Sequence, residues 1–296
     1  MKTSFYDQIS KNRRNSVFLF IFVFIVLVGL IYTISLIFAP ELSLVFLIFA
    51  MVFVFFYTYS TYKYGDKVVL KSVNAKKVGE GDKRYLHLIN TVEGLSIAAG
   101  IPKPKIYVME SEELNAFATG RNPENASVCV TTGLLKNLDR DEIEGVIGHE
   151  LSHIKNYDIR FATMIAVMVG LIAIISHIFL RSFRFGGSGG RKNNAAILIL
   201  IGILFAIIAP VVVRLIQLAI SRRREYLADS SSAEITRYPE GLASALEKIS
   251  KLNEGKLKVS EAVSHLFFVD PTKSALDSLY ATHPPVEKRI KILRSM

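Results

Sequence analysis

The chain alternates long apolar runs with polar segments. The first two apolar runs, residues 17–38 and 42–62, contain no charged residue. At ~1.5 Å per residue, a helix of either length crosses a hydrocarbon core of about 30 Å. Pro40 stands in the short joint between them, where it interrupts a continuous helix because it lacks an amide N–H. These features predict an N-terminal transmembrane hairpin over residues 1–62, whereas a cleaved signal peptide would have a shorter apolar part.

Two later apolar runs predict a second membrane hairpin and bring the expected number of transmembrane helices to about four. They cover residues 161–180 and 195–213, and a glycine-rich connection joins them. Basic residues flank both outer ends of the first hairpin, and such residues favour the cytoplasmic side. The polar segment after residue 62 should therefore be cytoplasmic. Because the connection at 181–194 also holds basic residues, a shallow or re-entrant second hairpin is an alternative to full crossing.

The two polar segments, residues 63–160 and 214–296, together have the size of one modest domain. We interpret them as two halves of one site, separated along the chain by the second hairpin over 161–213. In the first half, a helical stretch precedes short runs of β-forming residues bounded by turn residues. The expected elements are a helix over Leu86–Ile97 and strands over Lys105–Met109, Asn115–Thr119 and Ser127–Thr132. This pattern predicts an α+β membrane protein, mainly helical, with a small mixed or antiparallel sheet.

Composition narrows the class of protein. Hydrophobic residues make up 51% and charged residues 21% of the 296 positions, a balance typical of a membrane protein. Cys129 is the single cysteine, which excludes intramolecular disulfides and cysteine-rich zinc modules. Any metal must then be held by histidines and carboxylates. The net charge of +10 fits positive cytoplasmic flanks, so we expect a lipid bilayer, and no nucleic acid, as a partner.

The helix expected after Asp139 carries the candidate chemistry. Asp139 and Glu142 form a capping-box pattern, which predicts that a helix begins there. His149, Glu150 and His153 follow in the pattern H-E-x-x-H, so both imidazoles lie on one helix face and can hold one tetrahedral ion. Glu150 can then take a proton from metal-activated water and pass it to the leaving amine. The alternative is a polar helix face with two structural histidines.

A catalytic zinc site needs a third protein ligand. Segment 221–229 predicts a helix in which Glu225 and Asp229 lie on one face, one turn apart. Glu225 would complete a set of two histidines and one carboxylate, and Asp229 would accept the second ring N–H of a ligand histidine. A plain surface helix with Arg–Glu pairs would show similar spacing. Because the ligand helices adjoin both later apolar runs, we expect one Zn²⁺ per chain close to the membrane surface.

Four separated motifs occur in the order of a known family. They are NAFATG at 115–120, HELSH at 149–153, SRRREYLAD at 221–229 and THPP at 282–285. With these motifs the chain resembles, over nearly its whole length, the HtpX-like membrane zinc endopeptidases, relatives of the CAAX prenyl endopeptidases. The resemblance implies a gluzincin-type fold with zinc bound by His149, His153 and Glu225. It also implies that Glu150 is the general base in the proteolysis of misfolded or damaged membrane proteins on the cytoplasmic side.

The resemblance assigns roles to two further regions. Asn115, Ala116 and Phe117 look like the family's edge strand, which pairs with an extended substrate peptide through backbone groups. Asn115 would hold a substrate carbonyl, although a turn asparagine that opens a strand has the same signature. His283 matches a histidine expected to stabilise the oxyanion of the reaction, and Arg289 follows it as a residue that would orient nearby groups.

We therefore expect a multi-pass zinc endopeptidase of the cell membrane with its active site facing the cytoplasm. Its substrates would be unfolded or membrane proteins, handled in quality control during stress. Two alternatives are left open by the sequence: a processing protease for specific or prenylated substrates, and a non-catalytic membrane scaffold stabilised by zinc. Glu150 separates the enzyme from the scaffold, because a structural zinc site has no use for a general base. His87 and His265 fall outside any ligand spacing, and we expect His177, near the basic end of a later apolar run, at the membrane interface.

Overall fold

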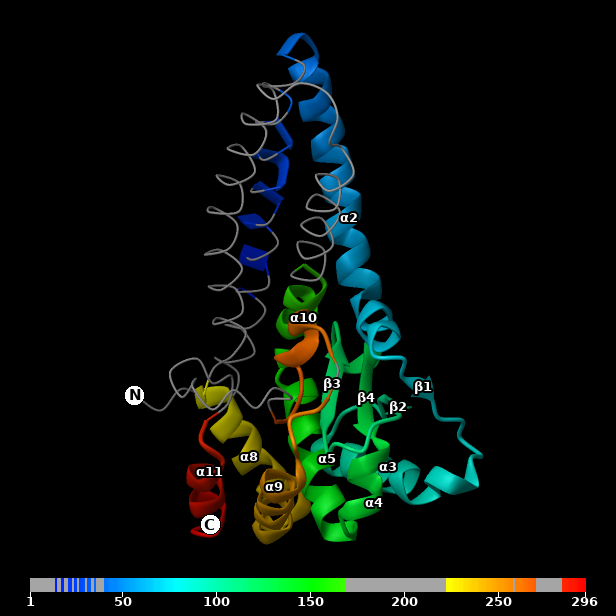
Figure 1. The fold of residues 1–296 in the computed structure, drawn as a ribbon, viewed down its shortest axis with the longest axis vertical. Helices are drawn as coiled ribbons and strands as arrows, with labels where there is room; N and C mark the ends of the chain where they lie inside the picture. Colours follow the sequence, from blue (N-terminus) through cyan, green and yellow to red (C-terminus); the bar gives the residue numbers. More distant parts are fainter. Residues whose placement is uncertain are drawn as a thin grey trace, which may run out of the picture.

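The structure of the chain is a computed structural model that describes residues 40–168, 222–257, 259–269 and 284–296, with isolated positions between 14 and 35. Most of the first predicted span and most of the predicted second hairpin lie outside the described residues. In the described part, one long helix projects from a mainly helical body that contains a small sheet (Figure 1). The mainly helical character and the small sheet confirm the predicted class of secondary structure.

The projecting element is helix α2, Ser43–Ser72, which follows the 3-10 turn η1, Pro40–Leu42. It continues ten residues beyond the predicted end at residue 62 (72 − 62 = 10). Two features explain the longer helix. Residues 63–72 contain no proline that would end the helix, and Val69 and Leu70 in this extension are buried against the body. Sequence hydropathy alone marks the end of the apolar run and not the end of the helix.

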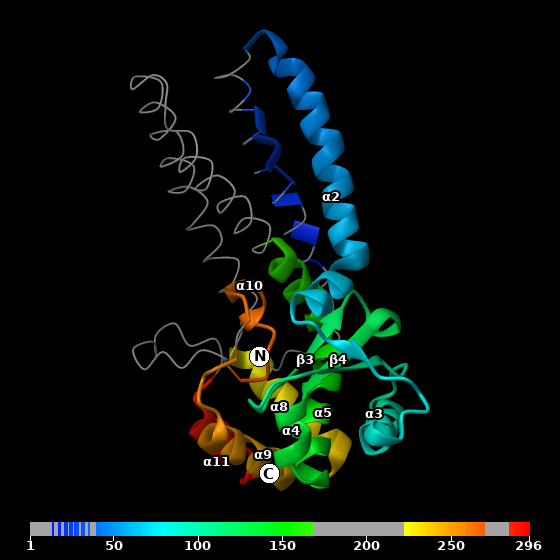
Figure 2. The same cartoon turned by 45° about the vertical axis from the view of Figure 1, so that its right-hand side comes forward.

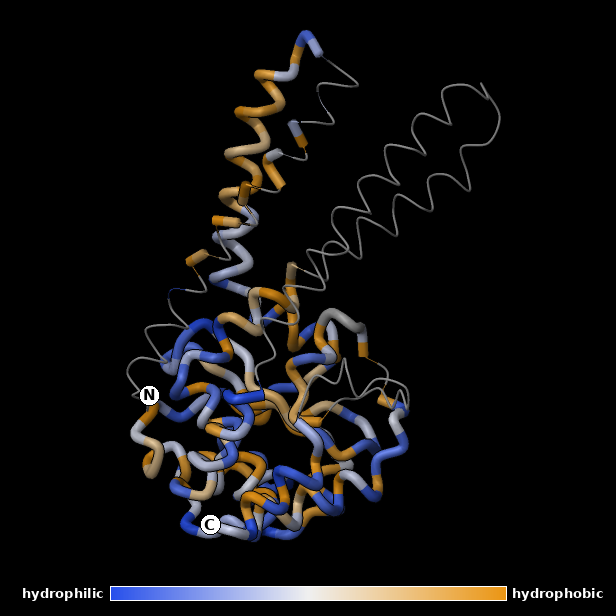
Figure 3. Tube along the Cα trace, turned by 90° about the vertical axis from the view of Figure 1, so that its left-hand side faces the viewer, coloured by the Kyte–Doolittle hydropathy of each residue, from blue (hydrophilic) through white to orange (hydrophobic). Residues whose placement is uncertain are grey.

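The surface of α2 suits lipid rather than water. Large apolar side chains such as Phe49, Phe53 and Phe56 are more than half exposed, whereas the smaller Ala50 and Val54 are buried. The helix extends away from the body (Figure 2), and its far part is mainly hydrophobic, whereas hydrophilic and hydrophobic residues alternate along the trace of the body (Figure 3). Among the described residues, this is the one helix long and apolar enough to cross a membrane. Of the roughly four predicted transmembrane helices, the described part of the chain thus contains one candidate.

The sheet has four strands in the order β1-β2-β4-β3. Strands β2 and β4 are parallel, and the β1–β2 and β3–β4 pairs are antiparallel, so the sheet is mixed. The strands are β1 (Lys76–Lys77), β2 (Lys105–Met109), β3 (Ala116–Gly120) and β4 (Ala126–Thr131). The three predicted strands are confirmed to within one residue at each end, and β1 was not predicted. Strand β3 lies at one edge of the sheet.

The body also contains helices and 3-10 turns. They are η2 (Lys83–Tyr85), α3 (Leu86–Ala99), η3 (Pro123–Asn125), α4 (Thr132–Asn137), α5 (Arg140–Lys155), α8 (Arg222–Thr236), α9 (Pro239–Leu252), α10 (Glu261–Ser264) and α11 (Val286–Leu293). Helix α3 was predicted over Leu86–Ile97 and ends at Gly100, whose left-handed conformation (φ 70°) caps it. Residues 158–168 are also helical.

Helix α5 lies at the centre of the body and packs against α3, α8, α9 and β3. Gly145 permits the close approach of α9, because a Cβ atom at this position would lie 2.6 Å from the Leu242 backbone nitrogen. One hydrophobic cluster joins Val128 of β4, Ile147 of α5 and Leu246 of α9. Residues on both sides of the predicted second hairpin therefore share one core, which fixes α5 and α8 side by side.

Candidate metal centre

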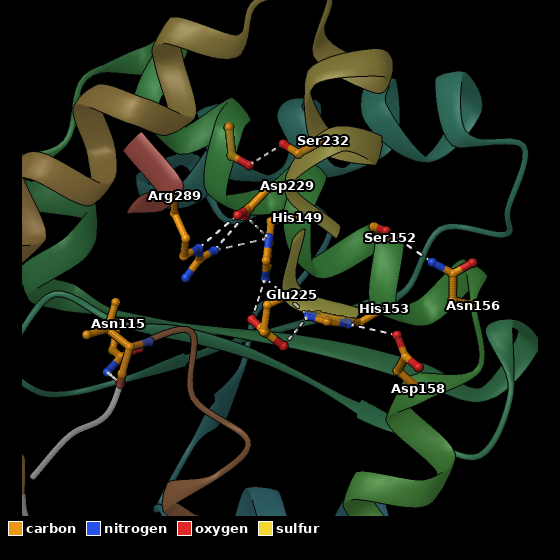
Figure 4. A network of polar contacts seen from close by, with 12 residues as sticks. Asn115, His149, Ser152, His153, Asn156, Asp158, Glu225, Asp229, Ser232 and Arg289 are labelled. Atoms are coloured by element: carbon orange, nitrogen blue, oxygen red, sulfur yellow. Dashed lines mark hydrogen bonds and ion pairs between the residues drawn. The ribbon is translucent and has the colours of Figure 1, made fainter. Parts of the chain in front are cut away.

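The first ligand helix, α5, begins where the sequence predicts. The Asp139 side chain accepts a hydrogen bond from the Glu142 backbone N–H (3.1 Å), and the Asp139 backbone N–H donates to the Glu142 carboxylate (2.9 Å). This reciprocal capping box satisfies two amide groups that have no partner within the helix. It sets the start of α5 and so places His149 and His153 one turn apart on the face that meets α8 (Figure 4).

His149, His153 and Glu225 converge on one point (Figure 4). The two Nε2 atoms of the histidines are 3.1 Å apart, and the Glu225 carboxylate oxygens lie 3.5 Å from Nε2 of His149 and 3.6 Å from Nε2 of His153. Ligand atoms that hold one tetrahedral ion at ~2.1 Å stand about 3.4 Å apart. Each histidine nitrogen thus lies at about this spacing from one of the two Glu225 oxygens, and one ligand atom from each of the three residues lies within 4.8 Å of the others. Imidazole and carboxylate are ligands that zinc accepts.

A carboxylate orients the ring of His149. Nδ1 of His149 lies 3.0 Å from the Asp229 carboxylate, and the Arg289 guanidinium binds that carboxylate through two contacts of 2.6 and 2.9 Å. All three side chains are buried. Burial raises the pKa of the Asp229 carboxyl, but the charge of Arg289 and the hydrogen bond with His149 outweigh it, so its pKa lies below the ordinary value. An ionised Asp229 fixes the tautomer in which Nε2 of His149 is free to bind metal.

The second histidine has its own carboxylate, which the sequence analysis missed. Nδ1 of His153 lies 3.0 Å from Asp158, and Arg224 of α8 lies 3.4 Å from the other oxygen of that carboxylate. Burial lowers the pKa of His153, but the hydrogen bond with Asp158 and the charge of Glu225 raise it to about 9. Asp158 follows the end of α5, where Tyr157 adopts a left-handed conformation (φ 60°). His153 and Asp158 are five residues apart in sequence, and the helix ends between them. Helical periodicity therefore could not reveal this contact.

Glu150 lies beside the three candidate ligands in a cavity of about 50 Å³. Burial raises the pKa of its carboxyl, and the charges of the two histidines and a backbone hydrogen bond from Ala118 oppose that rise. A carboxylate with a raised pKa can accept a proton from water and release it again near neutral pH. The residues around the cavity can therefore combine metal binding with proton transfer.

The predicted substrate-binding residues occupy the edge strand and the turn before it. Asn115 is buried, and its side-chain amide donates to the Val269 carbonyl (2.8 Å) while its side-chain oxygen accepts from the Val269 N–H (3.2 Å). The Ala116 carbonyl accepts from the Phe268 N–H (2.8 Å). Phe117 packs in a second hydrophobic cluster, and Ala118, which was not predicted, lines the cavity instead.

The other histidines fall into three groups. His283 and His177 lie outside the described residues. His265, which was given no role from its spacing, lines the cavity and lies 3.2 Å from the Ala162 carbonyl. His87 contacts Thr91 one turn along α3.

Known proteins share these features of sequence and fold. A family model described as Peptidase family M48 matches residues 82–296. A protease HtpX homologue from Dictyoglomus thermophilum is 46% identical over 294 residues, covering 99% of this chain and 95% of the relative. Another from Thermoanaerobacter pseudethanolicus is 48% identical over 250 residues, covering 83% of each.

A likeness in fold extends to a solved structure. Ste24p from S. mikatae matches 96% of this chain and 67% of its own chain with a TM-score of 0.50 and 18% identity, which supports the fold alone. The family match covers both ligand helices, and the HtpX relatives cover nearly the whole chain. With a histidine–histidine–glutamate cluster that can hold a metal at the centre of that match, the chain belongs to peptidase family M48 and is an HtpX-type metalloendopeptidase.

Proposed function

We propose that the chain is an integral membrane zinc endopeptidase that cuts misfolded or damaged membrane proteins at the cytoplasmic surface. The observation that carries this proposal is the convergence of His149, His153 and Glu225 beside the buried Glu150, at the base of a helix suited to lipid. A buried general base next to a three-ligand site with an open position favours catalysis over a structural metal role.

His149, His153 and Glu225 would hold one zinc ion, which supplies a Lewis acid that activates water and polarises a carbonyl when bound. Glu150 would take a proton from the attacking water and deliver it to the nitrogen of the leaving amine. The raised pKa of Glu150 suits both transfers, because the group must hold the proton and then give it up. His283 remains our candidate for stabilising the developing oxyanion.

The substrate would bind in an extended conformation along β3. Asn115, Ala116 and Phe117 lead into the edge of the sheet, where backbone groups can pair with a peptide of almost any sequence. Such pairing favours an unfolded segment, because most backbone groups of a folded protein are already hydrogen-bonded within that protein. This requirement supports misfolded rather than native proteins as the substrate class.

The distribution of lysines on α2 supports a cytoplasmic site at the membrane surface. Lys63, Lys67 and Lys71 are exposed and stand four residues apart, on one face of the helix where it reaches the body. Lysines at the end of a span favour the cytoplasmic side and attract anionic lipid headgroups. Arg160 lies over the Tyr62 ring (5.7 Å) at the same level, which ties the body to this part of α2.

Co-reconstitution with a membrane protein tests the proposed substrate class. The purified chain would be placed in vesicles with a membrane protein and with a destabilised variant of that protein, and cleavage would be followed with and without a zinc chelator. We expect chelator-sensitive cleavage of the destabilised variant at sites exposed on the side that carries the body of the chain. Equal cleavage of both forms at one fixed site would instead indicate a dedicated processing protease.

A further inference from the structure

The outward edge of β3 is already occupied by other parts of the chain. The Asn115 carbonyl accepts from the Thr131 N–H of the neighbouring strand. Because backbone groups alternate in direction along a strand, Ala116, Ala118 and Gly120 face away from that neighbour. The Ala116 carbonyl accepts from the Phe268 N–H, and the Gly120 N–H donates to the Thr163 hydroxyl (3.1 Å). Ala118, between them, adjoins Glu150.

Residues 266–269, which we call the cleft segment, bind this edge in the manner of a peptide. The Phe268 N–H donates to the Ala116 carbonyl at 2.8 Å, and both backbone groups of Val269 bind the Asn115 side chain. These are main-chain interactions, which depend little on the side chains of the bound segment. The cleft segment thus engages the two groups, Asn115 and Ala116, that we propose for substrate.

Two aromatic side chains anchor the cleft segment. Phe267 packs on Phe117 with ring centroids 4.9 Å apart, and Phe268 meets the His149 ring edge to face, also at 4.9 Å. The Arg289 guanidinium lies 5.0 Å from the centre of the Phe268 ring. Both phenylalanines are 1% exposed. Phe267 is therefore buried against an aromatic side chain of the sheet, and Phe268 is buried beside a candidate zinc ligand.

With the cleft segment in place, a peptide cannot enter. The cavity at the candidate ligands has a volume of about 50 Å³, which is room for one or two water molecules. His265, Leu266, Phe267 and Phe268 form part of its wall. A substrate carbonyl can reach the metal site along β3 once these residues have moved away.

We propose that the cleft segment is an internal occupant of the substrate cleft, and that productive substrates are extended peptides with adjacent bulky apolar residues that displace it. This inference rests on the proposed peptidase function of the same site. Bulky apolar side chains of such a peptide can take the places of Phe267 and Phe268 and recover the buried contacts that are lost when the cleft segment leaves. A polar peptide cannot recover these contacts. Competition with the cleft segment lowers the apparent affinity for every peptide, so weakly binding polar segments are rejected.

Hydrogen exchange on the full chain tests displacement directly. The zinc-loaded Glu150→Gln variant in mild detergent would be mixed with a ten-residue peptide that carries two adjacent phenylalanines at its centre, and exchange would be followed by mass spectrometry. At saturating peptide we expect faster exchange in fragments covering residues 263–269 and no acceleration in β3. Unchanged or slower exchange at residues 263–269 with peptide bound would overturn the proposal.

A variant of the cleft segment gives a second test. Phe267→Ala, made in the Glu150→Gln background, removes the contact with Phe117 and leaves the candidate zinc ligands untouched. We expect the phenylalanine peptide, labelled for fluorescence anisotropy, to bind at least about tenfold more tightly than to the parent. Leu70→Ala, a truncation in the same hydrophobic cluster on α2, serves as the matched control and should leave peptide affinity unchanged. Equal affinities of the Phe267→Ala variant and the parent would contradict the proposal.

The outcomes separate this inference from the proposed function. If the wild-type chain cuts unfolded casein while residues 263–269 stay protected with peptide bound, the peptidase function is supported. The proposal that the cleft segment occupies the substrate cleft is then wrong. If the wild-type chain does not cut casein at all, this cleavage assay contradicts the proposed function independently of the exchange and binding measurements. Absence of peptide binding to both Glu150→Gln and its Phe267→Ala derivative also counts against the internal occupant, because a released cleft should bind peptide.

Discussion

Nδ1 of His153 lies 3.0 Å from a carboxylate oxygen of Asp158, a residue that stands beyond the end of the helix that carries the histidine. The other oxygen of Asp158 lies 3.4 Å from Arg224 on α8. Arg224 is next to Glu225 in sequence. The contact therefore joins the end of one ligand helix to the start of the other, and it presents Nε2 of His153 towards the proposed metal.

Loss of the Asp158 carboxylate should weaken zinc binding. Asp158→Asn keeps the size of the side chain but loses the charge that favours the His153 tautomer with Nε2 free. We expect zinc affinity to fall about 10- to 100-fold, as measured by competition with a chromogenic chelator. Asp141→Asn, at an exposed position in the first turn of α5, is the control and should bind zinc as the wild type does. A wild-type affinity in Asp158→Asn would show that the contact has no role in metal binding.

The pH dependence of zinc binding follows from the same contact. In the zinc-free protein the pKa of His153 is about 9, and zinc requires the neutral imidazole. The proton must leave before the metal binds, so affinity should fall by about tenfold per pH unit below that pKa and level off above it. Chelator competition between about pH 7 and pH 10 would check this. An affinity that does not change over this range would rule out His153 as a protonated ligand in the zinc-free state.

Removal of Arg289 should destabilise the body. Arg289→Met leaves the Asp229 carboxylate buried with its principal cationic partner gone, a change that costs about 3–5 kcal/mol. Denaturant unfolding of the zinc-free chain would measure it as a lower free energy of unfolding. Arg294→Met is the matched control, because Arg294 pairs with Glu240 at the surface, where solvent screens the interaction and little change is expected. Similar free energies of unfolding for the two variants would contradict a stabilising role of the buried pair of Arg289 and Asp229.

Two glycines in helices should respond to alanine in opposite ways. Gly145→Ala would place its Cβ atom 2.6 Å from the Leu242 backbone and force α5 and α9 apart. A Cβ at Gly94 of α3 meets no atom within 4 Å. We expect the melting temperature to fall for Gly145→Ala and to rise slightly for Gly94→Ala, which gains about 0.5–1 kcal/mol from helix propensity. The same sign of change in both variants would be inconsistent with the packing of α5 on α9.

Local sequence signals predicted the elements that depend on near neighbours. The capping pair Asp139 and Glu142 set the start of α5, and the spacing of His149 and His153 set their common face, because both relations act within a turn or two of one helix. The strands bounded by glycine and proline were placed for the same reason. Glu225 was identified as a ligand candidate by its position on a second helix together with the family motif.

Relations between distant segments could not be predicted in this way. Asp158 approaches His153 through a left-handed turn at Tyr157, and Phe268 reaches Ala116 from 152 positions further along the chain (268 − 116 = 152). Neither contact has a characteristic spacing, since each depends on how completed elements pack. The extension of α2 beyond residue 62 has the same origin, because Val69 and Leu70 are held by the body and not by the membrane.

Comparison of wild type with Glu150→Gln tests the central claim most directly. Both full-length proteins would be purified in mild detergent, analysed for metal and assayed for cleavage of unfolded casein with and without a chelator. We predict about one zinc per chain in both, chelator-sensitive cleavage by the wild type, and a loss of at least about 100-fold in the variant. Cleavage by Glu150→Gln at the wild-type rate, or zinc in both proteins with cleavage by neither, would contradict the assignment of Glu150 as the general base of a zinc endopeptidase.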